Sequence, residues 1–374
     1  MLSNFTADIE AQFKINPKEL ARGSFGFVNE AWRNSDDLHV AIKTMIDNSI
    51  DLTTSKNLLR ELQLLANINH PKCLRLVAFT LAPVPKIVTP FMGNGTLNDV
   101  IVKLNEKRPD PNFTPTKMMC SVYGICSTMH FLHEKSIIHR DFKPLNVFLD
   151  DKYDICIADF GLSRKVEENV YMTMNNIGSP LYMAPELFTD EYETYTNKID
   201  VYSFGVSYLQ YFAKLEVLND KKGKIRSQQN LMMRISKGAR FPKPETANDD
   251  QYDIYTNCTL PNPNERPSFD YLCELFEKEK SLWFDGVDEK EYLDYVKECK
   301  SIIDNLIPKK EAQPAPQSED EHKKIDERES TTTTTTTSMS SSSTSSMNSL
   351  SLSLTGSSMS SSKLGSSGKK HKRY

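Results

Sequence analysis

Two stretches in the middle of the chain decide its fold class. His139–Asn146 reads HRDFKPLN, and Asp159–Gly161 follows shortly afterwards and reads DFG. A carboxylate such as Asp141 can orient an attacking hydroxyl and take its proton, while the ammonium of Lys143 can offset charge near a transferred group. The oxygens of Asn146 and Asp159 are hard ligands that suit Mg²⁺ against phosphates. The spacing therefore predicts a site for phosphoryl transfer.

Two earlier motifs fit the same chemistry. Ala21–Val28 reads ARGSFGFV and is typical of a glycine-rich loop whose backbone N–H groups approach phosphate oxygens. Taken alone, its glycines could equally mark an ordinary hairpin turn. Val40–Lys43 then places a lysine on an apolar strand, where it can bind the α/β-phosphates, and Glu61 on the following helix is the expected partner of Lys43. The loop residues expected near the nucleotide are Ala21, Arg22, Gly23, Ser24, Phe25 and Gly26.

With these motifs in order, the chain from about Leu20 to Leu275 resembles the eukaryotic protein kinase domain. The resemblance is greatest to the tyrosine-kinase-like branch of serine/threonine kinases. It rests on three further stretches, Met92–Leu97 (MGNGTL), Asp200–Gly205 (DVYSFG) and Pro263–Phe269 (PNERPSF). It implies an enzyme that uses ATP with Mg²⁺, or Mn²⁺ in its place, and that phosphorylates protein substrates.

The resemblance also assigns roles to single positions. Thr89 would be the gatekeeper beside the adenine, and the backbone of Pro90 to Met92 would meet the adenine edge. Asp200 would brace the catalytic loop, and Glu186 would form a buried ion pair with Arg266. The side chains expected to enclose the adenine ring are those of Leu20, Val28, Ala41 and Phe148.

The implied fold class is α+β, with a small antiparallel-sheet N-lobe that carries one main helix and a larger helical C-lobe. We expect a kinase domain over residues 13–280, divided into lobes at about 13–89 and 93–280. A helical extension is predicted over 281–308. Residues 309–374 have the Ser/Thr-rich composition of a disordered tail and end in a basic cluster.

Hydrophobic periodicity predicts the individual elements. In the N-lobe we expect strands over 27–32, 40–45, 74–79 and 87–89, with one helix over about 55–67. In the C-lobe we expect one helix that begins after a cap at Thr114 and runs through His133, and further helices over 201–212 and 269–277. The amphipathic stretch 289–306 is expected to pack on the large lobe or on a partner.

Two departures from the family pattern concern the start of the domain. Ala21 replaces the first glycine of the phosphate loop, which predicts weaker ATP binding. Pro17 lies in the first strand and cannot donate a ladder hydrogen bond, so that strand is expected to be frayed or truncated.

Substrate specificity is predicted from two features. Lys143 with Pro144, together with Ser179 before Pro180, resembles the serine/threonine pattern. The alternatives are a dual-specificity or tyrosine kinase and a catalytically weak pseudokinase or scaffold of the same fold. Tyr171 and Thr173 are candidates for phosphorylation by an upstream kinase or by the chain itself.

The overall composition limits the expected cellular localisation and the expected classes of binding partner. The net charge of -4 gives no reason to expect nucleic acid as a partner, and no apolar run is long enough to span a membrane. The seven cysteines form no CxxC pair, so we expect reduced thiols in a reducing compartment. The expected localisation is cytoplasmic, with the nucleus as the alternative.

Overall fold

The computed structural model describes residues 2–23, 26–45, 52–160, 163–165, 180–187, 195–213 and 233–307, with the backbone alone for 52–57 and 164–165. These residues belong to one compact unit, Met1–Glu311, and the second unit, Ala312–Tyr374, lies outside them. The predictions for the tail from residue 309 therefore also lie outside the described residues. The same holds for the predictions that concern Ser24, Phe25, Tyr171, Thr173 and Ser179.

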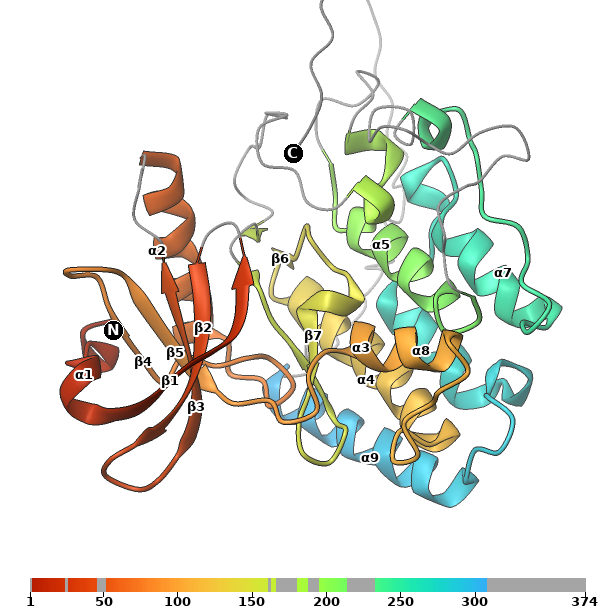
Figure 1. Ribbon diagram of the computed structural model, residues 1–374. Coiled ribbons are helices and arrows are strands. Elements are labelled where there is room, and N and C mark those ends of the chain that lie inside the picture. The colour runs from red at the N-terminus through yellow and green to blue at the C-terminus, as the bar shows by residue number, and fades with distance from the viewer. Residues whose placement is uncertain are drawn as a thin grey trace, which may run out of the picture. The chain divides into compact units, whose positions relative to one another are not determined.

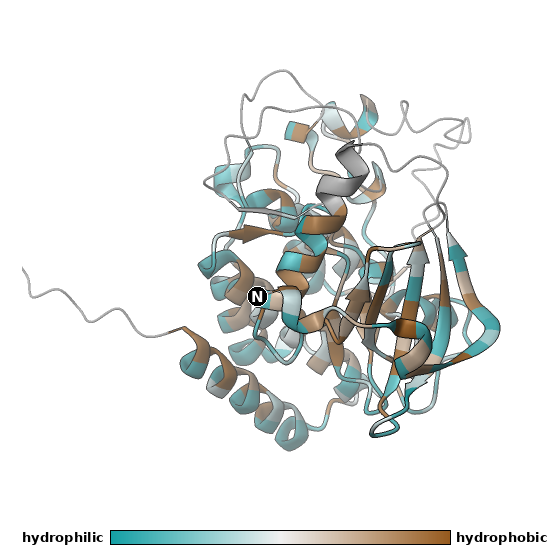
Figure 2. Cartoon of the chain, turned by 90° about the vertical axis from the view of Figure 1, so that its left-hand side faces the viewer, coloured by the Kyte–Doolittle hydropathy of each residue, from teal (hydrophilic) through white to brown (hydrophobic). Residues whose placement is uncertain are grey.

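A five-stranded antiparallel sheet forms the first lobe, in the strand order β1-β2-β3-β5-β4. Along β3 every second residue is buried, and Val40 and Ile42 join a cluster that includes Phe13, Ala31 and Val88. Figure 2 shows hydrophobic and hydrophilic residues interspersed along the strands. The sheet lobe is thus confirmed, with strands β1 (Phe13–Gly23), β2 (Gly26–Arg33), β3 (His39–Met45), β4 (Ala78–Thr80) and β5 (Lys86–Pro90).

The first strand is longer than predicted. β1 continues to Gly23, so the expectation that it is truncated was wrong. Its pairing with β2 is nevertheless irregular, with register shifts between Ile15 and Glu19 and between Glu19 and Ala21. Pro17 lies in the first of these irregular segments. The regular β1–β2 pairing is interrupted there, so the N–H group that proline lacks is not needed for a ladder hydrogen bond.

The strand predicted over 74–79 was also mostly wrong, because only Ala78 and Phe79 of it belong to β4. The backbone N–H groups before β4 bond elsewhere: that of Leu74 donates to Ile157, that of Leu76 to Leu65 and that of Val77 to Val88. This segment therefore connects three elements instead of extending one ladder.

An N-terminal segment covers the edge of the sheet at β4. It contains η1 (Leu2–Phe5) and α1 (Ile9–Gln12), and the Ala7 N–H donates to the Phe79 carbonyl at 3.0 Å. Ile9 is fully buried. The segment thus pairs with a strand edge that would otherwise expose unpaired backbone groups.

The second lobe is helical, as predicted (Figure 1). The cap prediction is confirmed, since the Thr114 hydroxyl accepts from the Lys117 N–H with Pro115 at the first helical position. The stretch predicted over 201–212 forms a helix that begins at Lys198, and the main N-lobe helix likewise begins earlier than predicted. The helices are α2 (Leu52–Asn67) in the first lobe, and α3 (Leu97–Asn105), α4 (Pro115–Glu134), α5 (Lys198–Leu209), α7 (Asp249–Cys258), α8 (Phe269–Lys278) and α9 (Glu289–Leu306) in the second.

Short elements connect these helices near the lobe boundary. β6 (Ile137–Ile138) pairs with β9 (Arg164–Lys165), and β7 (Val147–Leu149) pairs with β8 (Ile155–Ile157). The described part of this lobe also contains five 3₁₀ turns: η2 (Pro144–Asn146), η4 (Pro180–Tyr182), η5 (Pro185–Leu187), η6 (Pro263–Glu265) and η7 (Lys280–Leu282).

The last helix, α9, packs on the large lobe. Its residues Tyr292, Val296 and Cys299 are buried in the main core cluster together with residues of α4 and α8. The Tyr292 hydroxyl donates to the Phe276 carbonyl at 2.9 Å, and its ring packs edge-on against Tyr123 of α4. Of the two expectations for this stretch, packing on the large lobe is confirmed.

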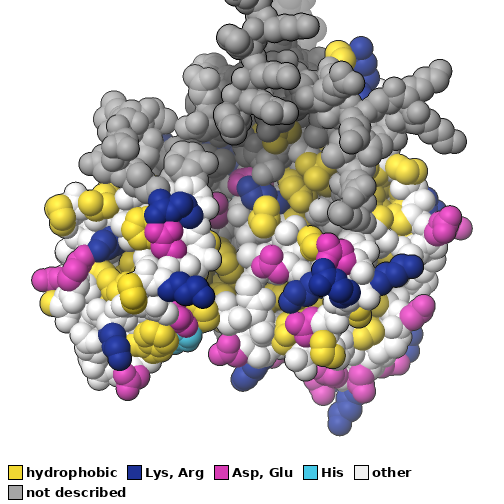
Figure 3. Space-filling model, in the orientation of Figure 1, with side chains coloured by type: hydrophobic (Ala, Val, Ile, Leu, Met, Phe, Trp, Pro, Cys, Tyr) yellow, Lys and Arg dark blue, Asp and Glu magenta, His cyan; other side chains and the backbone are white. Residues whose placement is uncertain are grey.

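All seven cysteines are free thiols, and six of them are buried. No helix in the described ranges combines the length and the apolar character needed to cross a bilayer. On the face drawn in Figure 3, acidic and basic side chains are interspersed, in keeping with the small net charge.

Candidate active site

Asp200 holds the backbone of the predicted catalytic loop through hydrogen bonds. This fully buried residue of α5 accepts from the backbone N–H groups of His139 and Arg140, each at 2.8 Å, and contacts His133 Nε2 at 3.0 Å. Burial opposes ionisation, but these partners together lower the pKa of Asp200. Arg140 adopts a left-handed backbone conformation with a φ of 71°. The predicted bracing role of Asp200 is confirmed.

The loop brings three of the predicted site residues together. Lys143 Nζ lies 2.5 Å from Asp141 Oδ2, and the Asn146 amide nitrogen donates to the Asp141 carbonyl at 2.8 Å and to its Oδ2 at 3.2 Å. Asp141 is buried apart from about a tenth of its surface. The carboxylate is therefore held by two side-chain donors, which fix its direction.

Asp159 lies at the end of the segment that follows β8. Its backbone φ is 64°, and its side chain is exposed while the next residue, Phe160, is fully buried. The Ala158 N–H donates to the Asn146 carbonyl at 2.9 Å, and the Ala158 carbonyl lies 3.0 Å from His139 Nε2. These two bonds join the strand before Asp159 to the catalytic loop. Gly161 lies outside the described residues.

Lys43 and Glu61 form the predicted pair. Lys43 Nζ on β3 lies 3.4 Å from Glu61 Oε1 on α2. The Glu61 carboxylate, and then that of Asp159, raise the pKa of Lys43 against the effect of burial. The ammonium therefore stays charged and lies near two carboxylates from different elements.

Strand register places the expected nucleotide-binding side chains on one face of the sheet. Val28 pairs with Lys43, and Ala41 pairs with Thr89. Directly paired residues point to the same face, as do residues two apart on one strand, so these four side chains share a face. That face is opposite to the one buried around Val40.

The other residues expected near the nucleotide belong to β1, to the segment after β5 and to β7. Ala21 pairs with Val28, Gly23 pairs with Gly26, and Leu20 is 48% exposed. The guanidinium of Arg22 pairs with Glu19 and lies 4.9 Å from the centre of the Phe27 ring. Met92 follows β5 and is half-buried, and Phe148 on β7 forms a backbone bridge with Thr96.

The oxygen donors fit a Mg²⁺ ion that is bound mainly through phosphates. Among the described residues no group of three or more His, Cys, Asp or Glu side chains could hold a metal ion. Mg²⁺ in nucleotide enzymes needs only one or two protein oxygens beside phosphate and water. Because the amide nitrogen of Asn146 is directed to Asp141, its amide oxygen points away from that residue. Asn146 and the exposed Asp159 could supply the two oxygens.

Glu186 and Arg266 form the expected buried ion pair. Arg266 Nη1 and Nη2 donate to the two carboxylate oxygens of Glu186 at 2.6 and 2.8 Å, and Arg266 Nε donates to the Leu260 carbonyl at 2.8 Å. The guanidinium also lies over the Tyr202 ring at 5.1 Å. The prediction of this pair is confirmed.

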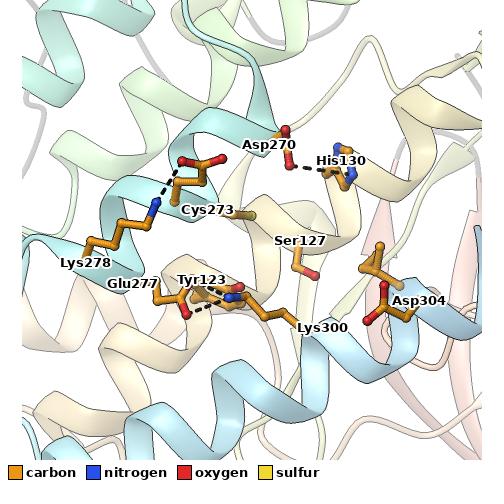
Figure 4. Close-up of a pocket in the computed structure, with 11 residues that line it drawn as sticks. Tyr123, Ser127, His130, Asp270, Cys273, Glu277, Lys278, Lys300 and Asp304 are labelled. Carbon is orange, nitrogen blue, oxygen red and sulfur yellow. Dashed lines mark hydrogen bonds and ion pairs between the residues drawn. The ribbon is translucent and has the colours of Figure 1, made fainter. Parts of the chain in front are cut away.

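A pocket of about 340 Å³ lies away from these residues, between α4, α8 and α9 (Figure 4). In its lining, Glu277 of α8 forms an ion pair with Lys300 of α9, and His130 of α4 lies 4.0 Å from Asp270 of α8. None of the predicted catalytic or nucleotide-binding residues lines this pocket. It is separate from the candidate active site.

Sequence reasoning missed one buried lysine, Lys72, outside the candidate site. Lys72, in the segment after α2, is only 3% exposed and pairs with Asp154 in the turn between β7 and β8. Its position directly after His70-Pro71 was the one available signal, but a lysine there would ordinarily be assigned to the surface.

Comparison with known proteins agrees with this geometry. The family described as protein tyrosine and serine/threonine kinase matches residues 15–276. A protein of Acanthamoeba polyphaga mimivirus, named as a serine/threonine-protein kinase/receptor, is 34% identical over 276 residues, which cover 71% of this chain and 15% of that protein.

Two further relatives are similar over a comparable share of the chain. The serine/threonine-protein kinase CTR1 of Arabidopsis thaliana is 30% identical, covering 70% of this chain and 31% of the plant protein. The tyrosine-protein kinase receptor TYRO3 of Danio rerio is 29% identical, covering 69% of this chain and 30% of the fish protein. The chain thus matches less than a third of the length of each of these relatives. It belongs to the protein tyrosine and serine/threonine kinase family.

Proposed function

We propose that this chain is an active protein kinase of the tyrosine-kinase-like branch that transfers the γ-phosphate of ATP to serine or threonine hydroxyls. The observation that carries the proposal is the cluster of Asp141, Lys143 and Asn146, in which a nearly buried carboxylate is held by two donors. Asp159 and the Lys43–Glu61 pair lie on the adjoining elements.

Each residue has a defined part in the proposed reaction. Asp141 orients the substrate hydroxyl and accepts its proton as the oxygen–phosphorus bond forms and the bond to ADP breaks. Lys143 offsets the negative charge on the transferred group. Lys43, held by Glu61, binds the α/β-phosphates, and Asn146 and Asp159 would hold Mg²⁺, which neutralises phosphate charge when bound.

We further propose that the adenine is enclosed by Leu20, Val28, Ala41 and Phe148, with Thr89 and Met92 at its edge. The shared sheet face of Val28, Ala41, Lys43 and Thr89 supports this placement. Serine/threonine specificity is supported by the contact between Lys143 and Asp141, which confines the space beside a short hydroxyl. Relatives named as serine/threonine and as tyrosine kinases both match, so the acceptor needs a direct test.

The test is a Mg²⁺-ATP assay on a mixture of peptides that offers serine, threonine and tyrosine acceptors in equal amounts. Asp141→Asn removes the proton acceptor and should lower kcat by about 10²- to 10⁴-fold. Lys43→Met should lower turnover strongly by removing the phosphate-binding cation. Asp253→Asn makes the same chemical change at an exposed position of α7 and should leave turnover unchanged.

Each outcome has a defined meaning. Equal turnover in the wild type, Asp141→Asn and Lys43→Met would contradict enzymatic activity and favour the scaffold alternative. Phosphotyrosine as the main product, identified by mass spectrometry, would contradict the proposed acceptor but not the reaction.

A further inference from the structure

The buried Lys72 is the centre of a polar cluster that joins three parts of the chain. We call Lys72, Asp154, Tyr295 and Glu298 the Lys72 cluster. Lys72 Nζ pairs with Asp154, lies 3.8 Å from Glu298 Oε1 and lies 4.5 Å from the centre of the Tyr295 ring. The Tyr295 hydroxyl donates to Asp154 Oδ1 at 2.7 Å. Burial opposes the charge on Lys72, but Asp154 and the other anionic partners outweigh it and raise its pKa.

The cluster lies between the elements that carry Glu61 and Asp159. The segment of Lys72 follows α2 and bonds to β8 on both sides of Cys73: the Ile157 N–H donates to the Lys72 carbonyl and the Leu74 N–H to the Ile157 carbonyl, each at 2.8 Å. Ile157 precedes Asp159 by two residues, and Asp154 precedes β8 directly. The Lys72 cluster therefore fixes the segment after the Glu61 helix against the strand before Asp159.

Helix α9 supplies Tyr295 and Glu298, and it lies beyond the matched family region of residues 15–276. The α4 helix leaves room for this contact. A Cβ at Gly124 would lie 2.3 Å from the Tyr295 hydroxyl oxygen and 3.0 Å from an Ile155 side-chain carbon. A glycine inside a helix lowers helix stability, and here it lets the tyrosine hydroxyl reach Asp154.

We propose that Tyr295 is a positioning residue for phosphoryl transfer. Its hydroxyl fixes the Asp154 carboxylate that binds Lys72. The Lys72 cluster thereby keeps the carboxylates of Glu61 and Asp159 in their positions near Lys43. This inference rests on the proposed kinase activity, and it adds a residue of α9 to the determinants of that activity.

The test compares two tyrosines of the same helix. Tyr295→Phe keeps the ring over Lys72 and removes only the hydroxyl that reaches Asp154. Tyr292→Phe is the matched control, because its hydroxyl donates to the Phe276 carbonyl within the large lobe. Tyr295→Phe should lower kcat by about 3- to 30-fold with little change in the KM for peptide, whereas Tyr292→Phe should keep kcat within about twofold of the wild type.

Gly124→Ala tests the same contact from the α4 side. Alanine favours the helix more than glycine does, yet its methyl group would displace the Tyr295 hydroxyl. This variant should therefore reproduce the loss of kcat seen in Tyr295→Phe. A kcat equal to that of the wild type in both Tyr295→Phe and Gly124→Ala would overturn the proposal.

Amide hydrogen exchange provides a readout that does not depend on turnover. The amides of residues 72–77 and 155–159 should exchange faster in Tyr295→Phe than in Tyr292→Phe. If the wild type shows no turnover, the proposed function fails, and the exchange comparison still decides whether Tyr295 holds these segments. Equal exchange in the two variants would show that it does not.

Discussion

At the scale of single residues, loss of one partner from the buried pair of Glu186 and Arg266 is expected to be strongly destabilising. Both side chains are almost completely buried, and the guanidinium contacts both carboxylate oxygens. Arg266→Met leaves a buried carboxylate without its cation, which should lower the free energy of unfolding by about 3–5 kcal/mol. Urea unfolding of the purified variant measures this loss.

Two further variants give this prediction its controls. Lys278→Met breaks an exposed ion pair with Glu274 and should leave the urea midpoint unchanged. Adding Glu186→Gln to Arg266→Met removes the uncompensated charge and should restore part of the lost stability. An Arg266→Met protein as stable as the Lys278→Met protein would contradict the prediction.

His70 predicts a dependence of stability on pH. Burial first, and then the charge of Lys72, lower the pKa of His70 from 6.5 to about 4, with Asp154 opposing them. Between these values the unfolded chain binds a proton that the folded chain does not. The free energy of unfolding is therefore unaffected by protonation of His70 above about pH 6.5. It decreases as the pH falls towards 4, by a total on the order of 3 kcal/mol.

Comparison with His70→Asn isolates this effect from other groups that titrate in acid. The His70 ring nitrogen Nδ1 accepts from the Lys72 N–H at 3.2 Å, and an asparagine side-chain oxygen can take over that bond. The free energy of unfolding should fall more steeply between pH 7 and 4.5 in the wild type than in His70→Asn. Parallel curves for the two proteins would refute the assignment.

At the scale of elements, the two glycines at the β1–β2 connection differ in what surrounds them. A Cβ at Gly26 would lie 2.2 Å from the Thr44 carbonyl oxygen of β3, whereas a Cβ at Gly23 would meet nothing within 4 Å. Gly26→Ala should push β2 away from β3 and lower stability by about 1–3 kcal/mol. Gly23→Ala is the matched control and should melt like the wild type in a thermal unfolding experiment; equal melting of both variants would contradict the prediction.

Elements whose ends are set by local chemistry could be predicted from the sequence. The start of α4 follows from Thr114 and Pro115, since a capping hydroxyl and a fixed φ act within a few residues. The strand predicted over 74–79 failed because its backbone groups bond to Leu65, Val88 and Ile157. Those partners are brought together only by the folded lobes, so the apolar pattern alone did not reveal them.

At the scale of the whole molecule, the order of the motifs was sufficient to predict two lobes and the loop that brings three candidate site residues together. Asp141, Lys143 and Asn146 are close in sequence, so their contact needs little beyond the local turn. The bond between Tyr295 and Asp154 joins residues 141 positions apart. Nothing in the amphipathic pattern of residues 289–306 distinguishes the tyrosine that contacts α8 from the one that contacts Asp154, and this contact required the structure.

The free cysteines have a practical consequence. Burial raises the pKa of Cys120, Cys156 and Cys299 to about 12, so their thiols remain protonated and shielded at neutral pH. Because Cys299 lies on α9 and Cys156 on β8, they are natural chemical probes of two different regions. The rate at which an alkylating reagent labels each one reports how often its part of the protein opens, and no engineered probe is needed.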